Sequence, residues 1–483
     1  MTAAELGIHA FGGYVPRLRV SREEIAAAHA WVNPGLSALA RSERSLCSWD
    51  EDAVTMAVDA ARNCLGRIDR HRITGLYLGS TTAPYADRLN VGLVAGALGV
   101  DESTPAFDLG GSLRAGTSAM LAGLDAAAAR GGDVLCVASD RRDAGPATIQ
   151  ELTIGHAAAA VVVGPGAGLA RLVGRSSLTV DFVGHFRASN RDVDYHWEER
   201  WVRDEGYGKL VPKLVQRLLE QTSVGPERIA HFCLPAPLRR VDEAAAASIG
   251  LPPTSIRNQL SAGCGDSGAA HPLLMLVSAL EDAKPGELIL VVGFGQGGDA
   301  LLFEATDAIR DFQPSRPWLQ PGASCSYPRY LALTDRLELD RGMRAEVDKG
   351  SALTAAYRHR DLVLALTGGR CEACGTHQIP RGEICVLCGS KGSLLPHSFA
   401  ESKGKVASWS ADSLTYTPDP PAFYGMVDFV EGGRLLMDFT DVSVGEVEVG
   451  TPMRMVFRIK DRDRVRGFAR YFWKAAPLMD KEV

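Results

Sequence analysis

PAFDLGGSLRAGTSAM, residues Pro105–Met120, is the stretch from which the rest of the chain can be interpreted. It begins as an apolar, extended segment, passes through Gly110 and Gly111, and continues into an alanine- and leucine-rich helical pattern that reaches Arg130. This order predicts a strand, a tight turn and a buried helix. A side chain on such a turn lies at a helix N-terminus, where free N–H groups and the helix dipole favour negative charge. The stretch therefore predicts a site suited to an activated nucleophile.

Strand-like apolar runs alternate with helical patterns on both sides of this stretch. In a first cycle we expect strands at Gly7–Pro16, Ile73–Leu78, Val134–Ala138 and His156–Val163, and helices after the N-cap Ser21 and at Ala53–Leu65 and Val91–Leu98. In a second cycle we expect strands at Leu178–Val183, Ile229–Leu234, Glu287–Phe294 and Ala300–Ala305, and helices at Lys209–Thr222, Asp242–Gly250 and Leu273–Glu281. This alternation predicts a largely parallel, layered sheet. Two cycles of similar length predict a duplicated α/β/α unit, although identity between the halves does not demonstrate the repeat.

The chain changes character after residue 310. Recurring prolines and a charged helical pattern at Leu337–Tyr357 predict a linker with a helical connector. Gly432-Gly433 between two apolar runs predicts a β-hairpin, and further strands at Met453–Ile459 and Gly467–Trp473 make the end of the chain a small all-β unit. We therefore divide the chain into the two halves 1–165 and 166–310 of a layered domain, a connector at 311–369, a metal-binding segment at 370–400 and an all-β unit at 401–483.

Composition is that of an ordinary soluble globular protein, with 46% hydrophobic and 23% charged residues. A net charge of −6 gives no electrostatic reason to expect nucleic acid, and no basic run suggests a membrane surface. We see no stretch of about 18 apolar residues and no signal-peptide pattern at Met1–Val20. We therefore expect a cytoplasmic protein with neither nucleic-acid nor membrane partners.

Ten cysteines in so long a chain do not suggest a disulfide scaffold, and four of them form two CxxC pairs. These four are Cys371, Cys374, Cys385 and Cys388. They supply the thiolates of a closed tetrahedral zinc site, and Gly375 and Gly389 after the pairs allow the tight turns of zinc knuckles. The alternative is four unliganded cysteines, against which the spacing argues. A site closed by four thiolates is structural, so we expect structural zinc and assign it no catalysis.

The central stretch resembles the nucleophile turn of the thiolase superfamily, and most closely that of hydroxymethylglutaryl-CoA synthases, which reads roughly Asp-Leu-x-x-x-Cys-Lys-Ala-Gly-Thr. Matching Asp108, Leu109 and Arg114–Thr117 puts Leu113 at the position of the acyl-accepting cysteine. Leucine cannot carry an acyl group, so the resemblance implies a kept scaffold and a lost nucleophile. The resemblance covers about Glu5–Asp307 and also rests on Trp49–Asp52, Ser80–Thr82, Pro235 and Gly295–Gly298.

The resemblance implies catalytic residues that differ from the family pattern. Glu51 occupies the acidic cluster in which the family has its general acid/base; the alternative is that Asp50, Glu51 and Asp52 are only helix N-terminal charges. Cys233 and Asp266 stand where the family has the histidine and asparagine that polarise the thioester carbonyl. An ionised Asp266 donates nothing to an oxyanion, whereas a protonated one, kept neutral by burial, donates.

Four residues of two glycine-containing turns are expected to border the substrate: Ser112, Leu113, Gly295 and Gly297. Ser112 is adjacent to the lost nucleophile, and the alternative is that it only shapes the turn. Cys264 and His271, which lie near Asp266 in sequence, are interpreted as packing residues rather than catalysts.

The segment Arg370–Pro477 resembles the zinc-ribbon plus OB-fold module that accompanies thiolase-type enzymes acting on acyl-CoA. The matching residues are the four cysteines with Gly375, Pro380-Arg381, Pro420-Pro421 and Gly432-Gly433. OB-folds also bind nucleic acid, but no aromatic-and-basic stripe favours that here. The expected fold is therefore α/β: a duplicated thiolase-like layered α/β/α domain, followed by a zinc ribbon and a small all-β OB-fold barrel.

The resemblance implies a coenzyme A thioester as substrate or ligand and leaves two functions open. The first is an enzyme that makes or breaks a C–C bond next to the thioester without an acyl-enzyme, as in an aldol or retro-aldol reaction, with Glu51 as base and Asp266 or Cys233 assisting. The second is a non-catalytic subunit that holds acyl-CoA or a separate thiolase. The polar residue at Asp266 favours the enzyme, because decay more often leaves apolar substitutions. A homodimer is expected because the family pairs its sheets across a two-fold axis.

Overall fold

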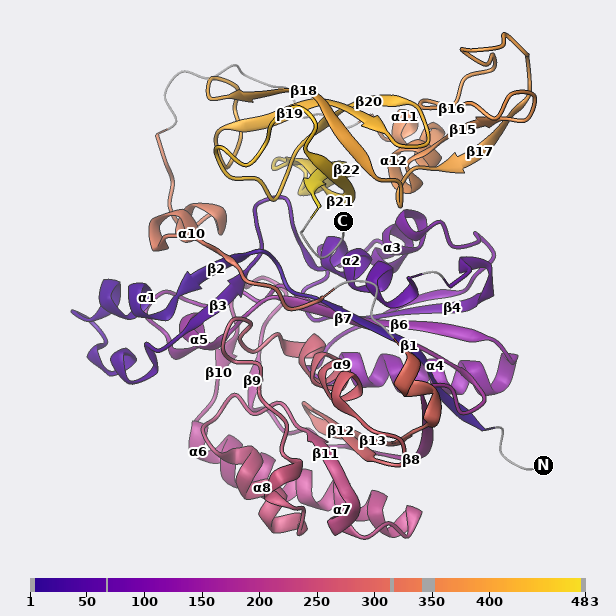
Figure 1. Cartoon of the computed structure of the whole chain (residues 1–483). Coiled ribbons are helices and arrows are strands. Elements are labelled where there is room, and N and C mark those ends of the chain that lie inside the picture. The colour runs from indigo at the N-terminus through magenta and orange to yellow at the C-terminus, as the bar shows by residue number, and fades with distance from the viewer. Residues whose placement is uncertain (1–4, 67, 313–316, 341–351, 479–483) are drawn as a thin grey trace. The chain divides into compact units, whose positions relative to one another are not determined.

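The computed structural model describes residues 5–66, 68–312, 317–340 and 352–478 (Figure 1). The chain divides into two compact units. The α/β unit comprises Met1–Cys47, Asp52–Gly92 and Val100–Tyr330, and the C-terminal unit comprises Ser48–Glu51, Leu93–Gly99 and Leu331–Val483. The short loop Ser48–Glu51 thus belongs to the C-terminal unit although it lies early in the sequence.

A nine-stranded sheet in the order β11-β12-β13-β8-β1-β7-β6-β4-β5 forms the centre of the α/β unit. Its strands are β1 (Leu6–Tyr14), β4 (Ile73–Gly79), β5 (Ala106–Leu109), β6 (Asp133–Asp140), β7 (Ala157–Pro165), β8 (Ala170–Thr179), β11 (Ile229–Cys233), β12 (Leu288–Phe294) and β13 (Gly297–Ala305). Smaller pairings join β2 (Leu18–Ser21) to β3 (Glu43–Leu46) and β14 (Ala323–Ser324), and β9 (His185–Phe186) to β10 (Tyr195–His196).

The two halves of this sheet repeat one topology. From the middle outward in the first half, β1–β7 and β7–β6 are antiparallel pairs, and β6–β4 and β4–β5 are parallel pairs. In the second half, β8–β13 and β13–β12 are antiparallel pairs and β12–β11 is a parallel pair. A parallel bridge from Phe232 to Ile256 stands where the first half has its outermost strand. The predicted duplication is therefore present. The prediction of a largely parallel sheet was wrong, because the last strand of each half returns antiparallel beside its neighbours.

Helices α2, α4, α7 and α9 pack on the sheet. The first ten helices along the chain are α1 (Arg22–His29), α2 (Ala53–Leu65), α3 (Asn90–Leu98), α4 (Ala115–Arg130), α5 (Ile149–Thr153), α6 (Glu199–Trp201), α7 (Val211–Thr222), α8 (Val241–Ile249), α9 (His271–Asp282) and α10 (Tyr327–Leu333). In Figure 1, α4 and α9 lie between the two halves of the sheet, with α2 against the other face of the first half and α7 and α8 against the second. The result is an α/β/α/β/α arrangement whose core contains Met120, Leu124, Leu274 and Met275 on the two central helices.

Local patterns predicted most elements to within a few residues, and two predictions were wrong. The strand expected at Leu178–Val183 is β8, which begins earlier, at Ala170, because it pairs with β13 along its whole length. Within the helical pattern Leu337–Tyr357, residues 337–340 are not helical, 341–351 lie outside the described residues, and only the end forms α11 (Leu353–Arg358). A π-helix at Val202–Leu210 precedes α7.

The C-terminal unit contains two small sheets. After α12 (Arg360–Ala365), β15 (Thr367–Cys371), β16 (His377–Gln378) and β17 (Leu394–Ser398) form a three-stranded sheet that carries the cysteine loops. Five antiparallel strands follow in the order β20-β19-β18-β21-β22: β18 (Gly404–Asp412), β19 (Ala422–Phe429), β20 (Arg434–Asp438), β21 (Pro452–Asp463) and β22 (Phe468–Pro477). A bridge between Phe439 and Ala475 makes the two edges of this sheet meet. The predicted hairpin is confirmed as β19–β20.

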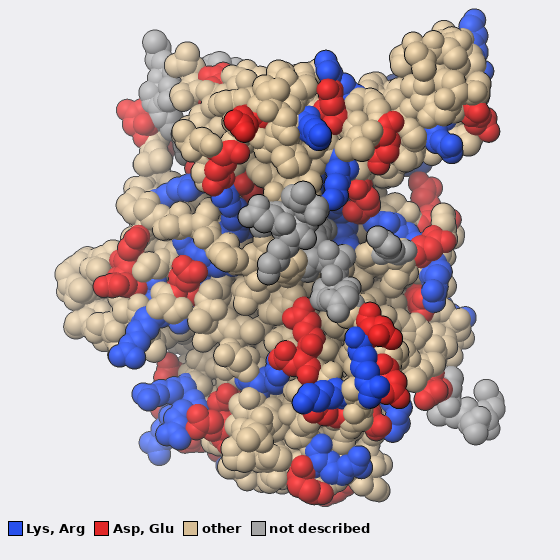
Figure 2. Space-filling view, viewed as in Figure 1, with Lys and Arg blue, Asp and Glu red and all other residues tan. Residues whose placement is uncertain are grey.

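Acidic and basic side chains are interspersed over the face drawn in Figure 2. Among the described residues, none of the helices combines the length and the apolar character that crossing a bilayer requires.

Candidate functional site

The central turn packs against the turn between β12 and β13. Ser112 lies just before α4, and its hydroxyl donates a 2.8 Å hydrogen bond to the carbonyl oxygen of Gly295. A Cβ atom on Gly295 would lie 2.7 Å from Ser112 Oγ and 3.1 Å from Leu113 N, so only glycine permits this approach. The tertiary structure thus brings together Ser112, Leu113 and Gly295, three residues singled out from the sequence.

A partly buried ion pair holds the start of α4 in place. Arg114 Nη1 lies 3.3 Å from Asp299 Oδ1 and donates to the carbonyl oxygen of Leu178 at 3.0 Å. Asp299 also accepts hydrogen bonds from the hydroxyls of Ser118 and Ser177, at 2.7 and 2.9 Å. Gly297 adopts a φ of 101°, and a Cβ there would lie 1.9 Å from Leu178 O, so this glycine is required by the backbone. These contacts hold the turn at the helix N-terminus in one geometry.

Asp140, at the end of β6, joins the Ser80–Thr82 turn to the segment before α9. Its carboxylate accepts hydrogen bonds from the hydroxyls of Ser80, Thr81 and Thr82 at 2.9–3.0 Å, and from the Ala269 N–H at 2.8 Å. Burial, which disfavours the charged form, raises the pKa of this carboxyl above its usual range. Sequence reasoning missed Asp140, although a charged residue at the end of a buried strand was the available signal.

Asp266 is held as a carboxylate. Burial alone would raise its pKa, but the Arg142 guanidinium, 3.3 Å away, together with His271 and the N–H of Gly268, leaves the pKa below the ordinary value. The protonated, hydrogen-bond-donating Asp266 considered from the sequence is therefore not the form that this environment favours. Arg142, which keeps Asp266 ionised, was not recognised in the sequence. It comes two residues after Asp140, the last residue of the buried strand β6.

Arg142 is the centre of a wider buried polar cluster. Its Nε atom donates to Asp194 at 3.0 Å, so one guanidinium bridges two carboxylates. His185 and His196 stack beside this pair with ring centroids 5.8 Å apart. Burial, followed by the Arg142 charge, lowers the pKa of His185 to about 4, so its imidazole is neutral at physiological pH. The arrangement places a fixed positive charge and polar acceptors beside Asp266.

Cys233 lies in a different environment. It is 0% exposed within the apolar cluster that includes Leu274, and its thiol donates to the carbonyl oxygen of Met275 at 3.6 Å. Burial raises the pKa of the thiol to about 12, so it stays neutral. These surroundings suit a packing residue. Cys264, also buried, has its thiol pKa raised to about 12 by burial, in line with the packing role expected from the sequence.

Glu51 lies in the Ser48–Glu51 loop of the C-terminal unit. It is 1% exposed; its Oε2 accepts the Ser48 N–H at 2.8 Å, and its Oε1 lies 3.5 Å from Arg458 Nη2. Capping of α2 is done by Asp52, whose carboxylate accepts the Thr55 N–H at 3.0 Å. Of the three acidic residues considered as helix N-terminal charges, only Asp52 therefore makes the capping contact.

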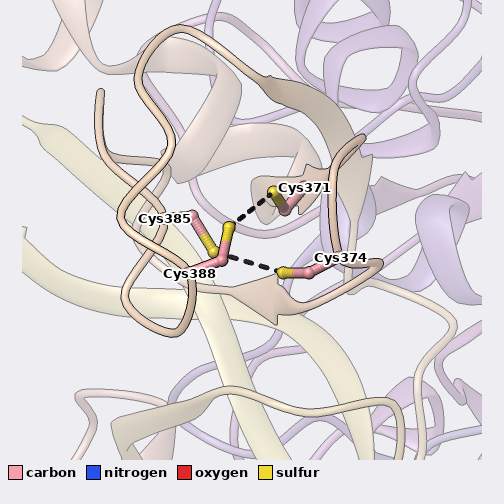
Figure 3. A group of neighbouring side chains, drawn as sticks. All are labelled: Cys371, Cys374, Cys385 and Cys388. Carbon is pink, nitrogen blue, oxygen red and sulfur yellow. Dashed lines mark hydrogen bonds between the residues drawn. The ribbon is translucent and has the colours of Figure 1, made fainter.

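The four cysteines of the two CxxC pairs converge on one point (Figure 3). Their sulfur atoms all lie within 4.8 Å of one another, with Cys371 to Cys388 at 3.8 Å and Cys374 to Cys385 at 3.6 Å. Zinc–thiolate bonds of about 2.3 Å in a tetrahedron require sulfur–sulfur distances of about 3.8 Å. The donor set and its spacing therefore fit a closed tetrahedral metal site.

The fold and the central turn define the class of protein. A hydroxymethylglutaryl-CoA synthase solved with CoA matches 72% of this chain and 95% of its own, with a TM-score of 0.60 at 17% identity. The 3-oxoacyl-(acyl carrier protein) synthase III of Pseudomonas aeruginosa matches 62% and 98%, with a TM-score of 0.56 at 19% identity. The α/β unit therefore has the thiolase-superfamily fold.

Sequence comparisons narrow the class. Residues 219–302 match the 3-oxoacyl-[acyl-carrier-protein] synthase III C-terminal family, and residues 399–458 match the C-terminal OB-fold domain of ChsH2. The hydroxymethylglutaryl-CoA synthase of Aeropyrum pernix is 32% identical over 349 residues, covering 71% of this chain and 93% of the relative. That of Methanopyrus kandleri is 30% identical over 350 residues, covering 69% and 98%. The chain belongs to the hydroxymethylglutaryl-CoA synthase family and carries an additional OB-fold domain.

Proposed function

We propose that this chain is an acyl-CoA enzyme that makes or breaks a C–C bond beside the thioester without forming an acyl-enzyme. The proposal is supported by the central turn, which is held in place by Ser112, Gly295 and Arg114 and in which the resemblance puts Leu113 at the nucleophile position. Family membership supports the substrate class, because the relatives are named hydroxymethylglutaryl-CoA synthases and one solved structure contains CoA.

In this reaction the chain needs one proton-transfer group and one polar anchor. Glu51 removes the proton from the carbon next to the thioester, and the resulting enolate attacks the carbonyl of a second substrate; the proton then passes to the new alkoxide. The retro-aldol direction reverses these steps. Asp266 as a carboxylate accepts a hydrogen bond from a substrate hydroxyl, and Arg142 keeps it ionised. Ser112, Leu113, Gly295 and Gly297 border the substrate. Cys233 is a weaker candidate than Asp266 for the assisting role, since its thiol donates to the carbonyl oxygen of Met275 in the core.

The second candidate is a non-catalytic subunit that holds acyl-CoA or a separate thiolase. Its support is the absence of a nucleophile at Leu113 and the packing environment of Cys233. The two candidates differ in whether the chain itself moves a proton. A structural zinc at the four cysteines is part of both, and the cytoplasmic location expected from the sequence stays a prediction.

We expect the chain to exchange α-protons of acetyl-CoA with D₂O while no acyl group becomes attached to the central turn. Incubation with radiolabelled acetyl-CoA, denaturation and peptide mapping should leave the Pro105–Met120 peptide unlabelled, because Leu113 has no nucleophilic atom. The Leu113→Cys variant is the matched control, since it restores a nucleophilic sulfur atom at position 113. Label on the wild-type peptide at Ser112 would place the nucleophile there. Absence of exchange, with any thiolase partner present, would favour the subunit.

We further expect a homodimer formed through the α/β unit. Strand β5 is hydrogen-bonded to β4 on one side only, at the edge of the nine-stranded sheet, and its Phe107 is 45% exposed. An edge strand with an exposed aromatic residue is suited to pairing with a second copy. Sedimentation at micromolar concentration should give a dimer, and Phe107→Lys should shift it toward monomer. A monomeric wild-type chain would contradict this expectation.

A further inference from the structure

Two buried cations of the OB-fold domain lie against the loop that carries Glu51. Arg458 on β21 is 0% exposed and Lys474 on the paired strand β22 is 2% exposed. Fully buried lysine and arginine are rare unless they are paired with anions. The loop Ser48–Glu51 supplies those anions, and it belongs to the same compact unit as the two strands.

Asp50 anchors the loop by several contacts. Its Oδ2 atom accepts from Lys474 Nζ at 2.9 Å and from the hydroxyl of Thr440 at 2.8 Å, and its main-chain carbonyl accepts the Ile459 N–H at 2.8 Å. The Lys474 ammonium also lies over the Trp49 ring, 4.1 Å from its centroid. Burial opposes ionisation of Asp50, but the Lys474 and Arg458 charges hold its pKa below the usual range. Asp50 is therefore a buried anion that depends on these two cations.

Glu51 is oriented from both ends of its carboxylate. One oxygen accepts the Ser48 N–H within the loop, and the other faces Arg458. Arg458 is itself held by Asp441, at 3.4 Å, and donates to the carbonyl oxygen of Phe457 at 3.0 Å. A guanidinium held by several partners has little freedom, so it defines where the Glu51 carboxylate lies.

We propose that Arg458 and Lys474 are positioning residues that hold the Trp49–Glu51 loop and thereby orient the Glu51 carboxylate. The OB-fold domain then contributes to acid/base chemistry in its own chain, in addition to any binding of substrate or partner. The catalytic consequence rests on the proposed function, whereas the holding of the loop does not.

The first measurement reports how firmly the Ser48–Glu51 loop is held, and it does not depend on catalytic activity. Hydrogen–deuterium exchange of the full-length Arg458→Gln variant should show the peptide that spans Ser48–Glu51 exchanging at least about tenfold faster than in wild type. Arg458→Lys should restore part of the protection, because it keeps the charge but not the planar fork. Lys460→Gln is the matched control: Lys460 lies on the same strand, pairs with Asp438 at 2.7 Å and is half-exposed. Lys474→Met tests the same loop through Asp50 if Arg458→Gln does not fold.

The second measurement is a double-mutant cycle on thioester α-proton exchange. Arg458→Gln should lower the rate by up to about 10²-fold, as a misplaced catalytic group does, and should lower it no further when combined with Glu51→Gln. A merely structural effect would lower both backgrounds equally. Unchanged protection of the loop in both Arg458→Gln and Lys474→Met would overturn the proposal. Faster loop exchange in a chain whose wild type moves no α-proton would support the holding of the loop and refute the proposed function instead.

Discussion

Glu51→Gln is expected to reduce α-proton exchange of the acyl-CoA by about 10²–10⁴-fold, the contribution typical of a general acid–base group. Glutamine has nearly the same size and keeps an oxygen that can accept the Ser48 N–H, but it has no basic carboxylate. Binding of acyl-CoA should therefore be largely kept. The measurement is deuterium incorporation at the carbon next to the thioester, followed by mass spectrometry, with binding measured separately by calorimetry.

Two controls make this result specific to Glu51. Glu23→Gln removes an exposed carboxylate from the first turn of α1 and should leave exchange unchanged. The measurement is repeated with any thiolase partner present, because the lone chain is not required to be active by itself. If the complex that contains the Glu51→Gln chain exchanged α-protons at the wild-type rate, this chain would not be the catalyst and only the binding role would remain.

Cys371→Ser is expected to remove bound metal and to unfold the cysteine loops. Wild-type protein should contain one zinc per chain, because the four sulfur atoms all lie within 4.8 Å of one another and one metal ion can bind them all. Structural zinc in small finger peptides is bound with an apparent free energy of about 10–16 kcal/mol, so its loss outweighs any other single contact in this segment. Metal analysis and hydrogen exchange of residues 371–393 measure the two effects.

Cys325→Ser is the matched control, since Cys325 is buried in the α/β unit and its thiol donates to the Ser326 carbonyl at 3.7 Å. A serine hydroxyl keeps that bond, and the metal content should stay at one zinc per chain. Carefully purified wild-type protein that contains neither zinc nor iron would contradict the metal site.

Much of the fold was accessible from local patterns. Helix α2 was predicted at its observed bounds, Ala53–Leu65, because apolar residues recur there at helical spacing. The structure adds that Asp52 caps its N-terminus. The β19–β20 hairpin was predicted because Gly432-Gly433 lies between two apolar runs. In the structure these glycines have φ of 112° and 93°, a backbone conformation that other residues rarely adopt. The four cysteines converge as their spacing required. In each case the determining interactions lie within about 20 residues of one another.

The charged groups behaved differently, because their partners are distant in the sequence. Sequence alone indicated that Asp266 and Glu51 were unusual, but it left the protonation of Asp266 open. Arg142, which is 124 positions away, decides it. Asp50 meets Lys474 across 424 positions, and no periodicity or motif relates them.

What the sequence by itself determined is therefore the element order, the central turn with a leucine at position 113 and the cysteine set, all of which depend on residue type and short-range spacing. Only the tertiary structure decided which buried charges face one another, and hence which carboxylates stay ionised. The physical reason is that the free energy of a buried charge depends on the few ångströms around it. Chain folding assembles that environment from segments that are far apart in the sequence and that no sequence pattern relates to one another.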